Sequence, residues 1–201
     1  SVMLSASSCL DWVCSITNNS IEEALKNAEK LSLNLQEIHE APFFLPYITG
    51  ERTPHNDPHI RGSFHSLKTA TNAAALQYSV IEGVSFGILD GVNSIKFVNN
   101  NFKNILMVGG GSRSSFWISL LATMLNKKLS LCEQSEFGAA LGVARLAMFV
   151  DSDISDKNSI ISNIKIKNTF NPNEKILAIL EKRYQLWKDI YISNKNLNYN
   201  L

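Results

Sequence analysis

The sequence has almost no net charge, few cysteines and no long apolar run. Its 19 basic and 18 acidic residues leave a formal charge of +1, too little for the positive surface that binds nucleic acid or an anionic membrane. The three cysteines have neither CxxC nor metal-ligand spacing, so nothing supports a disulfide or zinc framework. No stretch approaches the length of a membrane span, and the first residues lack a basic signal region. We therefore expect a cytoplasmic protein without a nucleic-acid or membrane partner.

What the chain does contain fits one globular domain. Hydrophobic residues make up 45% of its 201 residues and charged residues 18%, a composition that can bury a core. We expect a single domain over residues 1–193 and a frayed, Asn-rich tail over residues 194–201. The sequence starts without methionine and enters an apolar pattern at once, so we expect a piece of a longer protein.

Helical and strand patterns alternate along this domain. Apolar spacing and capping residues predict helices over about 4–16, 20–30, from Thr69 or Thr71 to 94, 116–125, 137–150 and from 172 onward. Short apolar runs predict strands over 43–48, 63–67, 105–108 and 129–132, and polar stretches predict loops over 53–62 and 151–171. Strands interleaved with helices are typical of an α/β domain.

Two groups of small residues indicate close packing. Gly83, Gly87 and Gly91 lie four residues apart on one stripe of the longest helix, where each costs about 1 kcal/mol relative to alanine. We therefore expect another segment to approach this stripe closely. The helix over 137–150 is rich in glycine and alanine, and we expect it to lie tight on a sheet or a neighbouring helix.

The glycine turn Gly109–Gly111 is the most informative site in the sequence. It stands between an apolar strand and a helix, so that open backbone and a helix N-terminus are available to phosphate. The turn lacks the Lys-Ser/Thr of the Walker A motif, and Ser114 occupies the third glycine position of GxGxxG. The residues alone therefore allow two interpretations, a nucleotide site near Ser112–Ser115 and a tight turn with a structural role only.

The turn-rich loop 53–62 contains residue types that bind metals. His55, Asp57 and His59 are such residues, but Pro58 prevents the two histidines from sharing a helix face. A self-bonded loop, in which Asp57 and Asn56 cap nearby N–H groups and Arg52 or Arg61 ties the loop to the body of the domain, is the favoured interpretation.

Two acidic residues have a structural and a chemical interpretation. Glu51 and Glu82 are candidate general bases, yet a carboxylate beside arginines is more often a structural ion pair. No Ser/His/Asp or Cys/His set can be recognised from spacing. The residues alone therefore assign no catalytic group and no metal ligand.

Four runs taken together resemble the C-terminal domain of the xylulokinases: Phe44–Pro58 (FLPYITGERTPHNDP), Arg61–Gly62, Val80–Gly91 (VIEGVSFGILDG) and Val108–Ser114 (VGGGSRS). The match extends over nearly the whole chain, and the GERTPHNDP loop is more characteristic of xylulokinases than of other sugar kinases. These kinases share two ribonuclease H-like domains with actin, hexokinase and glycerol kinase. The resemblance implies an α/β, ribonuclease H-like (actin-like ATPase) domain, with a mixed sheet flanked by helices and incomplete at its N-terminal edge.

The resemblance also implies a function and a site. The complete enzymes use ATP and Mg²⁺ to phosphorylate D-xylulose to D-xylulose 5-phosphate, and their glycine turn receives the adenosine. This places the nucleotide-binding residues at Gly109, Gly110, Gly111, Ser112, Arg113 and Ser115. The catalytic aspartate, the phosphate loops and most of the sugar pocket precede this domain in such kinases. We therefore expect the chain alone to be inactive and to meet D-xylulose and Mg²⁺ through an N-terminal domain.

Alternatives stay open beside this implication. A kinase for another pentulose or polyol is one, and a non-catalytic nucleotide-binding module is another. The oligomeric state is also open, with a homodimer as one candidate. Two serines depart from the family pattern: Ser112 stands where alanine is usual, and Ser66 replaces a glycine of the Gly-x-Phe-x-Gly-Leu signature. A positive φ at Ser66 would strain a serine.

Overall fold

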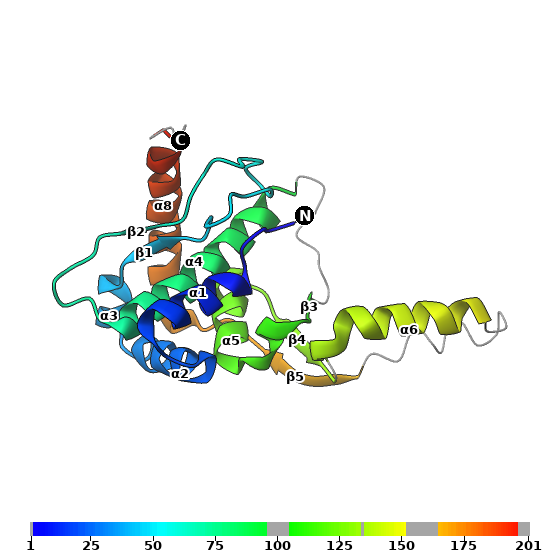
Figure 1. Cartoon of the computed structure of the whole chain (residues 1–201). Helices are drawn as coiled ribbons and strands as arrows, with labels where there is room; N and C mark the ends of the chain where they lie inside the picture. The colour runs from blue at the N-terminus through cyan, green and yellow to red at the C-terminus, as the bar shows by residue number, and fades with distance from the viewer. Residues whose placement is uncertain (1, 96–104, 134, 152–164, 197–201) are drawn as a thin grey trace.

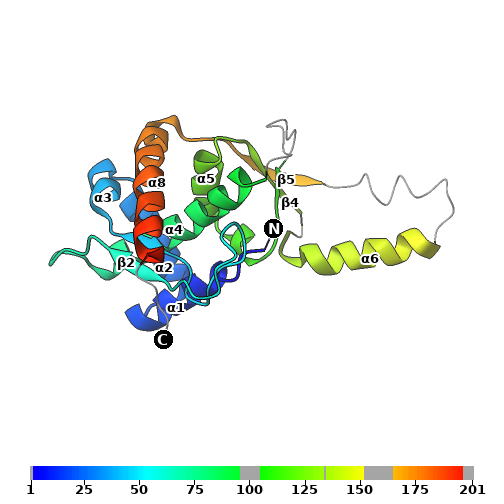
Figure 2. The ribbon, with the colours of Figure 1, turned by 90° about the horizontal axis from the view of Figure 1, so that it is seen from above.

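The computed structural model describes residues 2–95, 105–133, 135–151 and 165–196. A body of helices stands beside a small sheet, and one further helix extends away from both (Figures 1 and 2). The helices of the body are α1 (Ser7–Thr17), α2 (Ile21–Ser32), α3 (Leu35–Glu40), α4 (Ala73–Asn93), α5 (Ser115–Met124) and α8 (Glu174–Lys195). The strands are β1 (Phe43–Leu45), β2 (Ser63–His65), β3 (Ile105–Met107), β4 (Leu129–Cys132) and β5 (Ile166–Phe170), and the extended helix is α6 (Gly138–Asp151).

Helix α4 forms the centre of the helical body. Every residue from Gln77 to Gly87 is buried, because the helix contacts α1, α2, β1, α5 and α8. A Cβ atom on Gly83 would collide with the carbonyl oxygen of Phe44 in β1, and one on Gly87 would lie 2.9 Å from Cε of Met3. The expected close approach is confirmed at these two glycines. At Gly91 the nearest atom lies 3.8 Å from the Cβ position, which is an ordinary contact.

The three-stranded sheet is mixed. Strand β3 pairs in parallel with β4, and β4 pairs antiparallel with β5. The first pairing brings the carboxyl ends of β3 and β4 to the same edge of the sheet. Strand β5 falls within the predicted loop 151–171, of which 152–164 lie outside the described residues. Four of its five residues are exposed, so that it lacks the apolar alternation by which a strand is recognised.

Several helix ends follow from their capping residues. A capping box of Ser20 and Glu23 starts α2 next to the predicted first residue 20, and Asn18 ends α1 in the left-handed conformation, shortly after the predicted end near residue 16. Helix α4 starts later than predicted, because the cap is Asn72, whose side chain accepts a hydrogen bond from the Ala75 amide, and not a threonine. The short helix α3 was not predicted. Its six residues lie in a polar stretch, and Ile38 alone of them is buried.

Helix α8 runs further than the predicted domain end at residue 193. It continues to Lys195, and Asn194 is 2% exposed, with Nδ2 donating to the Arg61 carbonyl oxygen at 3.3 Å. The first residues of the expected tail are therefore ordered by contact with the loop after β1. Residues 197–201 of that tail lie outside the described residues.

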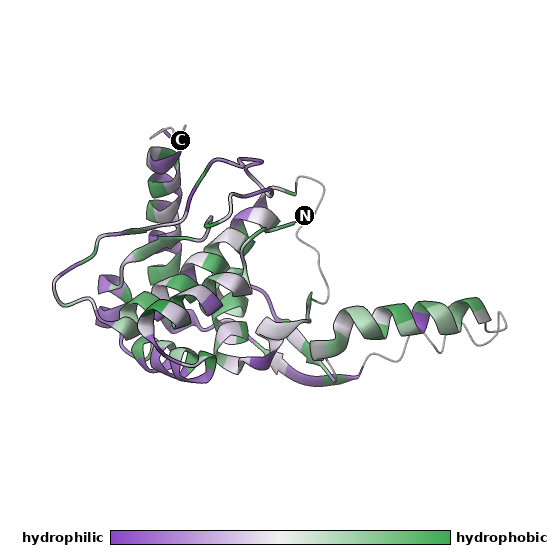
Figure 3. Cartoon of the chain, viewed as in Figure 1, coloured by the Kyte–Doolittle hydropathy of each residue, from purple (hydrophilic) through white to green (hydrophobic). Residues whose placement is uncertain are grey.

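Helix α6 corrects the expectation of tight packing. Its large apolar side chains Val143, Leu146, Met148 and Val150 are 56–85% exposed, and Figure 3 shows a mainly hydrophobic helix that projects from the body. Packing is close at its first residue, where a Cβ atom on Gly138 would lie 2.9 Å from Cβ of Val108. Small residues permit a close neighbour but do not supply one. No described helix has both the length and the apolarity of a membrane span.

Candidate nucleotide site

The glycine turn lies where β3 ends and the chain turns into α5. Gly109 has a φ of +87°, which glycine adopts without strain. A single 3₁₀ turn, η1 (Gly110–Arg113), follows, and Ser114 then caps α5 by accepting a hydrogen bond from the Trp117 amide at 3.2 Å. The structure thus places the six predicted residues on one turn and the first residue of α5.

One side of this turn is open. A Cβ atom on Gly109, Gly110 or Gly111 would meet no atom within 4 Å. Arg113 and Ser115 are exposed at the same turn, and the guanidinium of Arg113 adds a positive charge. Because the first N–H groups of a helical turn have no acceptor inside it, they are available to a ligand. A ligand can therefore lie directly against the backbone here.

The other side of the turn is closed by two buried serines. Ser112 is 3% exposed, and its Oγ donates to the Gly109 carbonyl oxygen at 2.7 Å and lies 2.9 Å from Oγ of Ser135. Its amide also donates to the Gly109 carbonyl oxygen, at 3.0 Å. Ser112 is one of the predicted nucleotide-binding residues. Its hydroxyl bonds within the protein, and a contact of Ser112 with the nucleotide stays a prediction.

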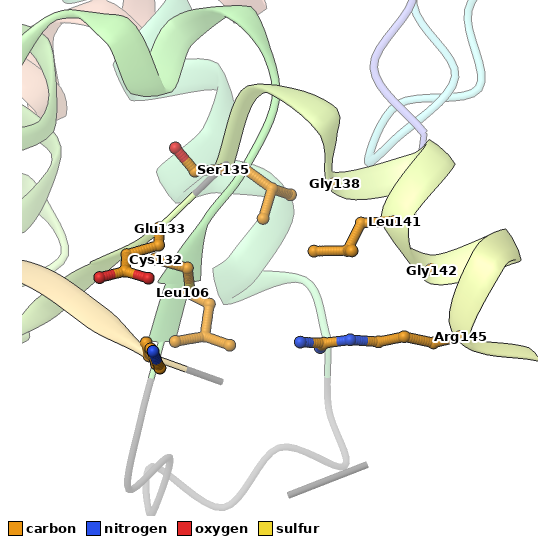
Figure 4. A pocket seen from close by; sticks show the side chains of 10 residues that line it. Leu106, Cys132, Glu133, Ser135, Gly138, Leu141, Gly142 and Arg145 are labelled. Atoms are coloured by element: carbon orange, nitrogen blue, oxygen red, sulfur yellow. The ribbon is translucent and has the colours of Figure 1, made fainter. Parts of the chain in front are cut away.

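Two hollows are lined by residues that flank the turn in sequence, Ser115 in one and Val108 in the other, while the three glycines line neither. One, of about 230 Å³, has Ser115, Phe116 and Ser119 of α5 on its wall. The other, of about 330 Å³, lies between the sheet and α6. Figure 4 shows Leu141 and Arg145 of α6 facing Leu106, Cys132 and Glu133 across it. The sequence does not predict the residues that line these hollows. They come from elements that are distant along the chain, and the local pattern of each element predicts only a helix or a strand.

The histidines of the loop 53–62 do not come together. His55 turns inward, with Nε2 2.9 Å from Oη of Tyr47 and 3.3 Å from Oδ2 of Asp90, and its ring stacks on Tyr191 at 3.7 Å. Burial lowers the pKa of His55, although Asp90 opposes the shift. His59 is exposed. Among the residues that the structure describes, no group of three His, Cys, Asp or Glu side chains could hold a metal ion.

The favoured interpretation of this loop, that it is bonded to itself, is confirmed. Oδ1 of Asp57 accepts hydrogen bonds from the amides of His59 and Ile60, each at 3.0 Å. The guanidinium of Arg61 donates to the carbonyl oxygens of Pro58 and Ile60, each at 2.8 Å. The loop therefore keeps its shape through its own side chains. The guanidinium bonds of Arg61 lie within the loop, whereas a tie to the body of the domain was expected.

Glu82 belongs to a buried ion pair. Its carboxylate receives Nε and one terminal nitrogen of Arg183 at 2.7 and 2.6 Å. Burial lowers the pKa of Arg183, but the Glu82 carboxylate more than offsets it, so that the pKa is raised. Burial in turn raises the pKa of Glu82, and the attraction of the Arg183 guanidinium and its two short charge-assisted hydrogen bonds oppose that shift. The structural interpretation of Glu82 is confirmed.

Glu51 is buried, and in the described part of the chain no arginine side chain pairs with it. Its Oε1 accepts hydrogen bonds from the amides of Leu4 and Arg52 at 3.0 and 2.7 Å, and burial raises the pKa of its carboxyl group. The expected pairing with an arginine side chain is therefore wrong. Two backbone amides take the place of the guanidinium.

A mixed sheet and an open glycine turn, with helices packed around them, are the features expected of an α/β domain of the actin-like type. Residues 2–150 match the C-terminal domain of the FGGY family of carbohydrate kinases. The chain belongs to this family.

The relatives include bacterial xylulose kinases. The chain is 32% identical to the xylulose kinase of Escherichia coli (strain K12) over 191 residues, which cover 95% of the chain and 39% of that protein. It is 32% identical to the xylulose kinase of Klebsiella pneumoniae over 98% of the chain and 40% of that protein. The crystal structure of the kinase from Brucella ovis has a TM-score of 0.83 at 33% identity, over 98% of the chain and 40% of that protein. The chain thus spans about two-fifths of these relatives, and the expected actin-like fold is confirmed.

Proposed function

We propose that the chain is the ATP-binding part of a kinase that transfers the γ-phosphoryl group of ATP to D-xylulose, forming D-xylulose 5-phosphate. The observation that carries this proposal is the similarity to xylulose kinases along 95% and 98% of the chain. The open side of the glycine turn supports the nucleotide part, because a ligand can approach the backbone of Gly109–Gly111 without displacing any side chain.

In this proposal the described residues bind and orient the nucleotide. The glycines admit the adenosine, while Arg113 and Ser115 flank it from the exposed side of the turn. Mg²⁺, when bound, neutralises charge on the phosphates during transfer. The described residues contain no cluster of three ligand side chains, so we propose that the metal is held through ATP and through residues outside this chain.

The sugar and the proton acceptor for its hydroxyl lie outside the chain in this proposal. The chain alone is then expected to bind ATP without transferring phosphate to D-xylulose. A cytoplasmic location and a homodimer remain predictions of the sequence.

Titration calorimetry of the chain with Mg·ATP tests the nucleotide site. We expect one saturable site, heats that are independent of added D-xylulose, and no D-xylulose-dependent release of ADP. A folded chain that shows no heat of binding with ATP would contradict the assignment.

A chimera tests whether the chain serves as the nucleotide half of such a kinase, since the sugar pocket in this proposal belongs to the other half. The chain replaces the matching segment of the Escherichia coli xylulose kinase, and the melting curve of the chimera verifies folding. We expect ATP-dependent phosphorylation of D-xylulose. A folded chimera that binds ATP but does not phosphorylate D-xylulose would favour a non-catalytic nucleotide-binding module.

A further inference from the structure

We propose that Ser112 and Ser135 are a pair of positioning residues that hold the glycine turn in the shape that receives the nucleotide. The inference rests on the proposed function, and it assigns the two side chains to the protein side of the site. Both are buried, with exposures of 3% and 7%. The two hydroxyls lie 2.9 Å apart, and that of Ser112 bonds to the backbone of the turn.

The direction of the hydrogen bonds follows from the number of protons. A serine hydroxyl has one proton to donate, and that of Ser112 goes to the Gly109 carbonyl oxygen at 2.7 Å. The contact of 2.9 Å between the two hydroxyls must then be donated by Ser135. The result is a relay in which Ser135 donates to Ser112 and Ser112 donates to Gly109.

The same two residues bind both polar groups of Gly109. Its carbonyl oxygen accepts from the hydroxyl and the amide of Ser112, and its own N–H donates to the Ser135 carbonyl oxygen at 2.9 Å. Ser135 stands on η2 (Ser135–Phe137), just before α6. The turn after β3 is therefore tied to the turn after β4.

Gly109 is the residue that most needs such a restraint. Its φ of +87° and ψ of −172° are one of many backbone conformations that glycine can adopt. No atom lies within 4 Å of its Cβ position, so packing does not restrict this conformation. The dihedral angles of Gly109 also set the direction of the next two peptides, which form the open side. A turn that is already fixed loses less conformational entropy when ATP binds.

The chain offers a matched control in Ser85. This serine is fully buried on α4, donates to the Ile81 carbonyl oxygen at 2.7 Å and accepts from Nε1 of Trp117 at 2.9 Å. The Ser85 hydroxyl thus makes the same two kinds of hydrogen bond as that of Ser112, but it has no contact with Gly109. Ser85→Ala reports the stability cost of losing a buried hydroxyl without loosening the turn.

The experiment measures the ATP Kd and the melting temperature of the 201-residue chain with Ser112→Ala, Ser135→Ala, both together, and Ser85→Ala. We expect each turn variant to raise the ATP Kd by about tenfold, equal to about 1.4 kcal/mol. The double variant should raise it no further, because the two hydroxyls act as one unit. Ser85→Ala should lower the melting temperature and leave the Kd unchanged. Amide hydrogen exchange at Gly109 and Ser112, whose N–H groups are hydrogen-bonded within the turn, should quicken in the turn variants alone.

The outcomes separate this inference from the function on which it rests. An unsubstituted chain that does not bind ATP contradicts the proposed function. A chain that binds ATP equally well with Ser112→Ala or Ser135→Ala overturns the positioning role, as does an equal loss with Ser85→Ala. If Ser112→Ala unfolds, Ser112→Cys keeps a weaker donor of similar size. It should then show an intermediate Kd, and an unchanged Kd overturns the proposal.

Discussion

Valine at position 111 should abolish tight ATP binding without unfolding the protein. A Cβ atom on Gly111 meets no atom within 4 Å, and the positive φ of the turn belongs to Gly109, not to Gly111. Valine can therefore be accommodated at a cost to the free energy of unfolding below about 1 kcal/mol, or about 2–4 °C in melting temperature. Its branched side chain fills the open side, where we place the adenosine. We expect the ATP Kd to rise by more than about tenfold, a loss of about 1.4 kcal/mol.

The assay pairs ATP titration with a melting curve for Gly111→Val. Gly142→Val is the matched control, since a Cβ atom on Gly142 also meets no atom within 4 Å and the residue lies on α6, away from the turn. The control should bind ATP normally. In the complete kinase Gly111→Val should raise KM for ATP and leave KM for the sugar unchanged. A folded Gly111→Val chain with unchanged ATP affinity would remove the nucleotide from the glycine turn.

Three further predictions concern stability. Arg183→Met leaves Glu82 buried and unpaired, so it should lower the free energy of unfolding by about 3–5 kcal/mol, measured as a large fall in melting temperature. Adding Glu82→Met to the same chain should restore most of the lost stability. A fall in melting temperature below about 2 °C for Arg183→Met would refute the ion-pair argument. Ser66 has a φ of +64°, and Ser66→Gly should stabilise the chain by about 1 kcal/mol; an unchanged or lower melting temperature would show that the residue is not strained. Because burial lowers the pKa of His55 in the folded state, the folded protein favours the neutral ring. The contribution of His55 to the free energy of unfolding should be complete above about pH 6.5 and be lost as the pH falls through the lowered pKa. Urea unfolding at pH 7 and at pH 5 measures this loss, which should be smaller in His55→Gln. An identical pH dependence in the variant would contradict the argument.

Elements with strong local signals were predictable. The capping box at Ser20 fixes the start of α2 whatever packs on that helix. Strand β4 is likewise recognised, because three of its four residues are apolar and the strand is buried along its whole length. Strand β5 was not found, because its exposed residues follow no apolar pattern and its assignment depends on hydrogen bonds to β4. The ion pair of Glu82 was expected as a type, but its partner Arg183 is 101 residues away, a separation that no local pattern spans.

The candidate site also has a part that the sequence predicts and a part that it does not, and the strand order of the sheet explains the difference. The turn at Gly109–Gly111 is recognisable because strand, glycines and helix are consecutive in the chain. Ser135 lies 23 residues beyond Ser112, and its side chain type gives no sign of a role. The parallel pairing of β3 with β4 places the segments after both strands at one edge of the sheet, which is where ligands of open α/β sheets bind. The residues just after β4 thus become candidates for the second half of the site once that pairing is known. A substitution there should then affect the nucleotide through Gly109 and not through direct contact.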